Sequence, residues 1–338
     1  MADDLYLSID FGTNNGPGTD DGKTRPWNGA APFYTNTSIW VDPGYDKAEV
    51  GRTTTVKVRV SNRGAQTVPS VVVQAWLFEP QIGVWTPGTG LPFVSSGSTD
   101  IPPGSGTLSA SDSHVVTCRA DPDWVPTQEQ LDRTKAHMCI IANCYSDEVS
   151  GEGGPAPADI GLEPATNPRQ GQRNIALVKV QQAAASEPQS VPYYTSPPHT
   201  EPGPHGPYLR DLLITSQQVA VSNVIGVSEL LALANLPEVK VPEGGFAKGE
   251  LLLRTSYGTK PIRPHLAPMR FGLKAEGIPD LGQRFRLDPD ERERVPCHLE
   301  FHFGEGADVG SLQIFDVTLH TEKEVIGAGL RVIALVTE

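Results

Sequence analysis

Long apolar runs are missing from this sequence. No stretch reaches the roughly 20 apolar residues that a membrane-spanning helix needs. The opening residues, MADDLYLSIDFG, carry neither a basic segment nor a long apolar one. We therefore expect no membrane insertion and find no secretory signal. The expected location is cytoplasmic as synthesised, with release as part of a larger particle as the alternative.

A surplus of positive charge is missing as well. The 27 Lys and Arg residues face 40 Asp and Glu residues, which leaves a formal net charge of −13. Nucleic acids and anionic membranes attract proteins through basic surfaces. The composition therefore argues against nucleic acid and anionic membrane as main partners.

Cysteine is scarce and shows no metal or redox spacing. The four cysteines are Cys118, Cys139, Cys144 and Cys297, and no two of them form a CxxC pair. Cys139 and Cys144 are an odd number of residues apart, so on one regular strand their side chains point to opposite faces and cannot form a disulfide there. We expect four reduced and buried thiols, with Cys139 the most buried.

Catalytic signatures are also missing, since the sequence contains no GxSxG, GxxxxGK or HExxH pattern. His298, Glu300 and His302 share one face of an expected strand. At roughly 3.3 Å per residue the two histidines lie about 13 Å apart, too far for one metal ion. A solvated outer face explains these residues better. The sequence thus predicts no catalytic, cofactor-binding or metal site and no enzyme.

One loop rich in side-chain oxygens leaves an alternative for calcium. Asp10, Asn14, Asp20 and Asp21 carry hard oxygen ligands of the kind that Ca²⁺ takes. Their spacing is not that of an EF-hand loop. Because Asn and Asp in such loops commonly cap turns, we expect turn capping here and keep calcium as the alternative.

What the sequence does contain is many short alternating runs rich in Val, Ile and aromatic residues, which predict an all-β protein. Thr53–Asn62 alternates strictly, with the valines Val56 and Val58 on one face and Lys57 and Arg59 on the other. The run His137–Tyr145, HMCIIANCY, predicts a buried central strand. The other elements expected in the first half are the strands Val68–Phe78, His114–Ala120 and Asn174–Gln181 and a short helix at Thr127–Lys135. Val68–Phe78 is apolar on both faces, which indicates a strand in the middle of a sheet or a strand covered on its outer side.

Proline marks the expected boundary between two domains. Residues 183–207 contain a proline every few positions, which is typical of a semi-rigid linker. We expect domains at 1–182 and 208–338. In the second domain Arg294–Phe303 alternates clearly, and Val227–Leu236 fits a short helix or a buried strand. In Ser311–Leu319 the apolar residues switch from one face of the expected strand to the other, which predicts a β-bulge near Ile314.

Several short motifs of the first half occur in a recognisable order. They are DLYL, an acidic Gly-rich loop, SIWVD, VKVRVSNRG, Trp-Val-Pro, HMCIIA and QRNI. Over residues 3–182 this order resembles the bacterial immunoglobulin-like domains of the CARDB (cell-adhesion-related) type. The resemblance implies an immunoglobulin-like β-sandwich and a binding or scaffolding role. His137-x-Cys139 then stands where such folds place Tyr-x-Cys on strand F, and the expected strand B, Thr53–Asn62, lacks the cysteine for an inter-sheet disulfide.

We therefore expect an all-β chain of two immunoglobulin-like antiparallel β-sandwiches joined by a Pro-rich linker. The expected function is a non-enzymatic structural, adhesion or assembly role, in which the chain binds another protein or itself through its β-sandwich surfaces. Two alternatives stay open. One is a carbohydrate-binding module, with or without calcium, that uses exposed Trp27, Tyr34, Tyr45 or Trp85. The other is a hydrolase with a loop-assembled site that is not visible in the sequence.

Overall fold

The computed structural model divides the chain into two compact units. Unit 1 consists of residues 1–79, 84–174 and 202–207, and unit 2 consists of residues 80–83, 175–201 and 208–338. The residues that the structure describes are 7–9, 25, 33–36, 38–43, 48–83, 85–103, 115–134, 137–187, 189–195, 211–216, 250–255, 269–272, 283–286, 295–301, 303, 307–310, 312–320 and 326–338.

Unit 1 is built around β10 (Cys139–Tyr145), as the apolar run predicts. Every residue of β10 is buried. It pairs antiparallel with β5 (Val68–Phe78) on one side and with the first part of β11 (Gln170–Gln181) on the other. Because β10 has a neighbour on each side and a cover on each face, apolar residues occupy both parities of the run.

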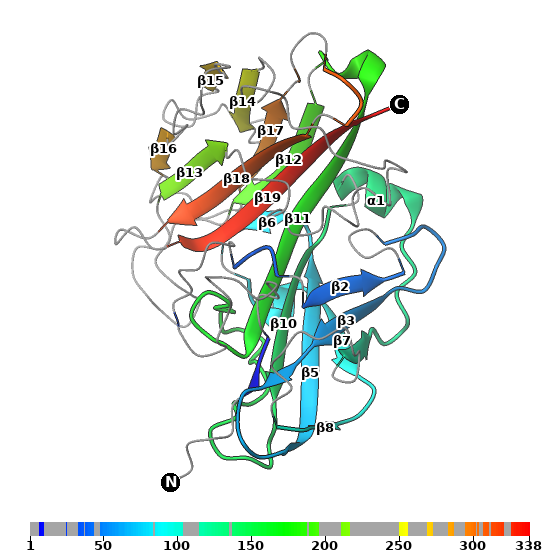
Figure 1. The fold of residues 1–338 in the computed structure, drawn as a ribbon, viewed down its shortest axis with the longest axis vertical. Helices are drawn as coiled ribbons and strands as arrows, with labels where there is room; N and C mark the ends of the chain where they lie inside the picture. Colours follow the sequence, from blue (N-terminus) through cyan, green and yellow to red (C-terminus); the bar gives the residue numbers. More distant parts are fainter. Residues whose placement is uncertain are drawn as a thin grey trace. The chain divides into compact units, whose positions relative to one another are not determined.

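The opposite layer of unit 1 contains β2 (Ile39–Asp42), β3 (Thr55–Arg59) and β9 (Val115–Arg119). These strands pair antiparallel in the order β2-β3-β9, and β7 (Leu91–Ser95) pairs with both β5 and β9 and so links the layers (Figure 1). The orders β2-β3-β9 and β5-β10-β11 are those of the ABE and CFG strands of an immunoglobulin-like sandwich. The predicted all-β, immunoglobulin-like fold is confirmed.

Three short strands and a helix complete unit 1. β1 (Leu7–Ser8) pairs with β4 (Ser61–Asn62), and β8 (Thr99–Ile101) pairs with β5. The expected helix is α1 (Gln128–Thr134). Short 3-10 helices lie at residues 87–89 in unit 1 and 182–184 in unit 2.

The core between the two layers follows the predicted alternation. Val56 and Val58 of β3 are fully buried, whereas Lys57 and Arg59 are half-buried on the outer face. Burial of such side chains stabilises the fold by about 1.5–3 kcal/mol each. The core residues contributed by the facing strands include Ile39, Val41, Val56, Val58, Val71, Val73, Ala75, Val116, Cys118, Ile140, Ala142 and Cys144.

A row of side-chain amides covers the outer face of the β5-β10-β11 layer. Gln74, Asn143 and Gln170 lie opposite one another on the three adjacent strands. Their amide groups bond main-chain atoms of the segment 154–163, at 3.0, 3.2 and 2.6 Å respectively. Because this amide row satisfies polar main-chain atoms of the segment, the segment can lie against the sheet.

The covering segment and a neighbouring loop explain why β5 is apolar on both faces. Trp76 and Phe78 occupy the outward parity of β5 and are nevertheless buried. Gly90 passes directly over them, since a Cβ at this position would lie 2.7 Å from the Phe78 ring. Only glycine permits so close an approach of the main chain.

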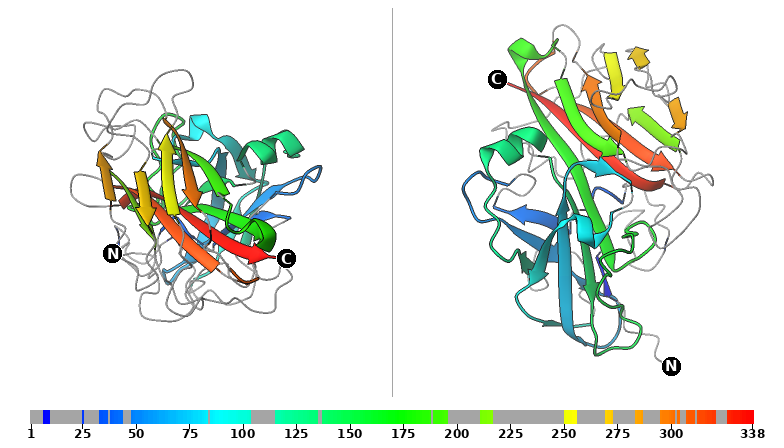
Figure 2. Two further views of the ribbon diagram at one scale, coloured as in Figure 1. Left: turned by 90° about the horizontal axis from the view of Figure 1, so that it is seen from above. Right: turned by 180° about the vertical axis from the view of Figure 1, so that it is seen from behind.

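Unit 2 contains two mainly antiparallel sheets (Figure 2). One has the order β16-β13-β18-β19-β11 and the other β15-β14-β17-β12-β6, with parallel pairing only for β11 with β19 and β12 with β6 among the described strands. The strand bounds are β6 (Gln81–Ile82), β12 (Gln189–Thr195), β13 (Asp211–Ser216), β14 (Glu250–Thr255), β15 (Met269–Gly272), β16 (Gln283–Arg286), β17 (Val295–Phe301), β18 (Leu312–His320) and β19 (Ile326–Thr337).

The Pro-rich range 183–207 differs from the linker predicted for it. Residues 189–195 form β12, which pairs with β17 along its whole length, and the boundary between the units falls after Asn174, within β11. Val191 and Tyr193 are buried, as an alternating strand requires. β6 pairs only with the last two residues of β12, so Pro192 lies where β12 is an edge strand, a place that tolerates proline.

The β-bulge predicted near Ile314 is wrong. β18 pairs with β19 in unbroken register from Leu312 to Leu319, and the register shifts only between Leu319 and His320. Asp316, Val317 and Thr318 are all buried, so both faces of β18 are covered and a change of apolar parity needs no bulge. The run Val227–Leu236 lies outside the described residues.

Candidate interaction surface

β2 is the terminal strand of its layer among the described residues, and one of its edges is open. On the other edge it pairs with β3, and Arg59 N donates to Ser38 O at 2.7 Å. In an antiparallel pair, residues that exchange such bonds alternate with residues whose N–H and C=O point away. Ile39 and Val41 are of the second kind. Their main-chain groups therefore point to the open edge, and no described residue hydrogen-bonds them there.

The outer face of β2 presents an aromatic residue with a cation stacked on it. The guanidinium carbon of Arg59 lies 5.7 Å from the centroid of the Trp40 ring. A cation over the face of an indole is attracted by its negative face, which is worth about 0.5–1 kcal/mol at an exposed site. Trp40 and Arg59 are both half-buried, so part of this pair is open to a ligand.

The neighbouring cation on the same face already has partners. Lys57 Nζ donates to Thr117 Oγ1 at 2.9 Å and lies 3.5 Å from Asp42 Oδ2. The Asp42 side chain is 54% exposed, so this ion pair is screened by solvent and contributes little to stability. The Lys57 ammonium is thus held by partners on both neighbouring strands, Thr117 on β9 and Asp42 on β2.

Tryptophan and arginine are the residue types that most often dominate the energy of protein interfaces. Trp40, Arg59 and the open edge at Ile39 and Val41 together form what we call the β2 edge. The sequence placed Arg59 on an outer face but did not single out Trp40. The signal for Trp40 was present in the alternation of SIWVD, which puts Ile39 and Val41 inward and Trp40 outward.

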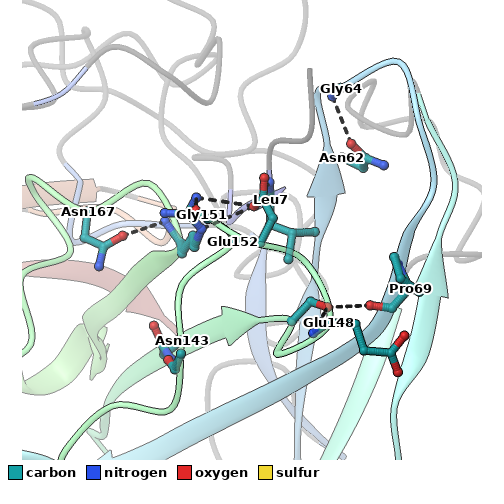
Figure 3. Close-up of polar contacts among 12 residues, drawn as sticks. Leu7, Asn62, Gly64, Pro69, Asn143, Glu148, Gly151, Glu152 and Asn167 are labelled. Carbon is teal, nitrogen blue, oxygen red and sulfur yellow. Dashed lines mark hydrogen bonds and ion pairs between the residues drawn. The ribbon is translucent and has the colours of Figure 1, made fainter. Parts of the chain in front are cut away.

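A second polar cluster lies at the loop 146–169 and anchors the N-terminal strand (Figure 3). The buried Glu152 carboxylate accepts a hydrogen bond from Leu7 N at 2.8 Å and lies 3.3 Å from Arg169 Nε. Arg169 also donates to the carbonyl oxygen of Gly151, and its main-chain N–H donates to Asn167 Oδ1 at 3.0 Å. The charges of this cluster neutralise each other, so its role is to hold β1.

The aromatic residues expected to be exposed for sugar binding are not exposed where the structure describes them. Tyr34 is 2% exposed and Trp85 is 1% exposed. Tyr34 packs edge-on against Phe33, with the ring centroids 5.3 Å apart. The expectation of an exposed aromatic platform is therefore wrong for Tyr34 and Trp85, whereas Trp27 and Tyr45 lie outside the described residues.

The calcium candidates Asp10, Asn14, Asp20 and Asp21 lie outside the part of the chain that the structure describes. Within it, no group of three or more His, Cys, Asp and Glu residues could hold a metal ion. His298 and Glu300 lie on β17, as expected, and His302 is outside the described residues.

Three of the four cysteines are free and buried, as predicted, and they are Cys118, Cys139 and Cys144. Burial raises the pKa of the Cys118 thiol to about 12. Burial also raises the pKa of the Cys139 thiol, although a hydrogen bond from Gln172 opposes the shift. These thiols are protonated at neutral pH and are therefore poor nucleophiles. Cys297 lies on β17.

His137 is buried and hydrogen-bonded to the neighbouring strand. It is 2% exposed, and its Nε2 lies 2.7 Å from Asn174 Oδ1 on β11. The bond ties the start of strand β10 to the adjacent strand. This is the place where the sequence suggested that histidine replaces the tyrosine of immunoglobulin-like folds.

No helix in the described part of the chain is both long and apolar enough to cross a membrane. No family model, of the CARDB type or any other, matches the sequence. No curated protein matches it either.

Among solved structures, the chain is similar to three bacterial surface proteins. One is the collagen adhesin CNA from S. aureus, at 6% identity over 89% of this chain and 92% of that chain, with a TM-score of 0.21. Another is the N-terminal region of the enterococcal surface protein, at 8% identity over 94% and 99%, with a TM-score of 0.21. The third is the Enterococcus faecalis MSCRAMM ACE, at 8% identity over 91% and 98%, with a TM-score of 0.21. The immunoglobulin-like fold of unit 1 is shown by its own strand order.

Proposed function

We propose that this chain is a non-enzymatic adhesion or assembly protein that binds another protein, or a second copy of itself, through the β2 edge of unit 1. The observation that carries the proposal is the open edge. The N–H and C=O groups of Ile39 and Val41 point away from β3 and meet no hydrogen-bond partner among the described residues. Such edges accept a strand from a partner readily, because each added residue completes main-chain hydrogen bonds.

Trp40 supports specific binding at this edge. Main-chain hydrogen bonds give affinity without regard to sequence, whereas side chains beside the added strand give specificity. Trp40 is half-buried in the free chain and lies on the strand that the partner would join. An added strand would cover its exposed part, and burial of aromatic surface is the main source of energy at interface centres.

The immunoglobulin-like setting fits this role. The resemblance of residues 3–182 to CARDB-type domains implies binding or scaffolding. The side chains of Ile39 and Val41 are buried in the core. This packing holds β2 in place, so its open edge keeps a fixed position for a partner. The proposed place of action is the cytoplasm, or a larger particle that leaves the cell.

The two alternatives have less support in the described residues. The carbohydrate alternative asks for exposed aromatic rings, and Tyr34 and Trp85 are buried. The hydrolase alternative asks for a histidine free to exchange protons with a substrate, and His137, the histidine whose surroundings the structure describes, is buried against Asn174. These observations favour binding without turnover.

The test is a charge placed on the β2 edge. Lysine on an edge strand opposes strand addition, so Trp40→Lys should lower partner binding about tenfold. The matched control is Ile160→Lys, because Ile160 is 44% exposed and lies in the segment that covers the other layer. Sedimentation velocity of the full chain measures self-association. Immobilised chain and quantitative mass spectrometry measure the recovery of one identified protein from the source cells.

The proposal expects Trp40→Lys to lose self-association or the identified partner while Ile160→Lys keeps it, with both variants matching the parent in circular dichroism. Equal binding by both variants would contradict the β2 edge as the site. If the chain neither self-associates nor recovers a protein but binds a sugar array specifically, the carbohydrate alternative replaces the proposal.

A further inference from the structure

Arg59 carries its charge from the second strand of the layer to the edge strand. Its Cα belongs to β3, yet its guanidinium lies over the ring of Trp40 on β2, 5.7 Å from the centroid. The charge is thus near a side chain of the edge strand, which is the strand that a partner would join.

The Arg59 guanidinium has no anion beside it within the described residues. No ion pair includes Arg59, and its Nε is buried without a hydrogen-bond partner among the described residues. Three other described cations have carboxylate partners. Lys57 lies beside Asp42, Arg169 beside Glu152, and the buried Arg331 beside Asp316. A buried guanidinium N–H without a partner costs free energy, so a ligand that supplies an acceptor is favoured.

A strand added to the β2 edge would bring one of its side chains to this position. Side chains directly opposite each other on neighbouring strands have Cβ atoms about 4.5–5.5 Å apart and point to the same face. The residue of an added strand that lies opposite Trp40 therefore points to the outer face, beside the Trp40 side chain whose ring the Arg59 guanidinium lies near. A carboxylate there would accept charge-assisted hydrogen bonds, which are about twice as strong as neutral ones.

We propose that the β2 edge takes an extended peptide segment with Asp or Glu at the residue opposite Trp40. The inference rests on the proposed function and names the chemistry of its partner. Local charge favours this occupant, since the Arg59 guanidinium has no carboxylate partner among the described residues, whereas the Asp42 carboxylate on the same edge strand already pairs with Lys57. A polyanion such as nucleic acid could neutralise the Arg59 charge. It could not form the ladder of main-chain hydrogen bonds with Ile39 and Val41 that an added strand forms.

The probes are three fluorescent ten-residue peptides of alternating Thr and Val that differ only at one central Thr position, replaced by Glu, Gln or Lys. Fluorescence anisotropy with the full chain measures their Kd at low and high salt. We expect the Glu peptide to bind about tenfold more tightly than the Gln peptide, and the Lys peptide to bind least. The preference for Glu should shrink at high salt because the pair is partly exposed.

Two variants of the chain identify the cation responsible. Arg59→Gln should abolish the preference for the Glu peptide over the Gln peptide. Lys57→Gln is the matched control, because Lys57 has the same parity on the same strand but points to Thr117 and Asp42. It should keep the preference. Thermal unfolding of both variants checks that they remain folded.

The outcomes separate this inference from the function on which it rests. If the Glu and Gln peptides bind equally and Trp40→Lys weakens both, the β2 edge stands and the carboxylate inference is overturned. If Arg59→Gln keeps the full preference for Glu, the inference is overturned as well. If none of the peptides binds, the inference is overturned. The comparison of Trp40→Lys with Ile160→Lys in partner binding then still tests the proposed function. If a Glu peptide N-methylated along one edge binds unchanged and dextran sulfate displaces it, a general polyanion site replaces the proposed strand partner.

Discussion

Buried polar groups in unit 1 are held by specific partners. Glu152 is 1% exposed and accepts a hydrogen bond from Leu7 N, which fixes the first described strand. His137 is tied to Asn174 in the same way. Breaking a buried pair leaves an unsatisfied group at a cost of about 1–3 kcal/mol. Such residues therefore report on folding rather than on binding.

The buried thiols predict a loss of stability at alkaline pH. In the folded chain the pKa of Cys118 is raised from 9.0 to about 12. Above pH 9 the unfolded chain binds fewer protons than the folded chain, so the free energy of unfolding falls as pH rises. The contribution of Cys118 is fully present below pH 9 and is lost between pH 9 and 12, at up to about 1.4 kcal/mol per pH unit. Urea unfolding over a pH series measures the slope.

The control for this prediction is Cys118→Ala, measured over the same pH series. The variant is expected to have lower stability throughout, because it leaves a cavity in the core. Above pH 9, its free energy of unfolding should fall less per pH unit than that of the parent chain. Identical slopes would contradict an alkaline loss caused by this thiol.

Single elements depend on local signals that act before packing. The helix α1 begins with a reciprocal cap, in which Gln130 N donates to Thr127 Oγ1 at 3.2 Å and Thr127 N donates to Gln130 Oε1 at 2.9 Å. This is the capping box of a Thr-x-x-Gln sequence. The cap satisfies two N–H groups at the start of the helix, and Leu131 on the helix is buried.

Removing this cap should weaken the protein by a small and measurable amount. We expect Thr127→Ala to lower the free energy of unfolding by about 1 kcal/mol, because Gln130 N loses its acceptor. Thr127→Ser keeps a hydroxyl and should lose much less. Urea unfolding of the three proteins measures both effects, and an equal loss in the two variants would contradict a capping role.

Strands were predicted well where alternation was strict and poorly where proline dominated. The run Thr53–Asn62 gave the inward and outward faces of β3 correctly, because side-chain direction in a strand is a local property. The range 183–207 was predicted as a linker from its prolines alone. Its part QSVPYYT pairs with β17 instead, a contact with a distant segment that no local pattern reveals.

The pairing of β12 with β17 should protect this part of the chain from proteolysis. Tyr193 is 1% exposed and belongs to a strand paired residue by residue with β17. Proteases need an extended, accessible segment, so native protein should resist chymotrypsin at Tyr193. Timed digestion with mass spectrometry of the fragments measures the order of cuts.

The same digestion in urea is the control, since the unfolded chain should be cut after Tyr193. A first cut at this position in the native protein would restore the linker predicted for 183–207. Cuts elsewhere, with Tyr193 protected, would agree with β12 as part of unit 2.

The all-β class, the buried central strand at His137–Tyr145 and the outward position of Arg59 could all be predicted from local sequence patterns. These properties follow from alternation and composition, which act over a few residues. Only the tertiary structure decided that β2 is an edge strand and that Arg59 lies over Trp40. Strand pairing joins segments that are far apart in the chain, and it is selected by the packing of the whole sandwich rather than by any local pattern. The buried state of Tyr34 and Trp85 was decided in the same way, because an aromatic side chain in a loop has no preferred face until the sandwich has formed.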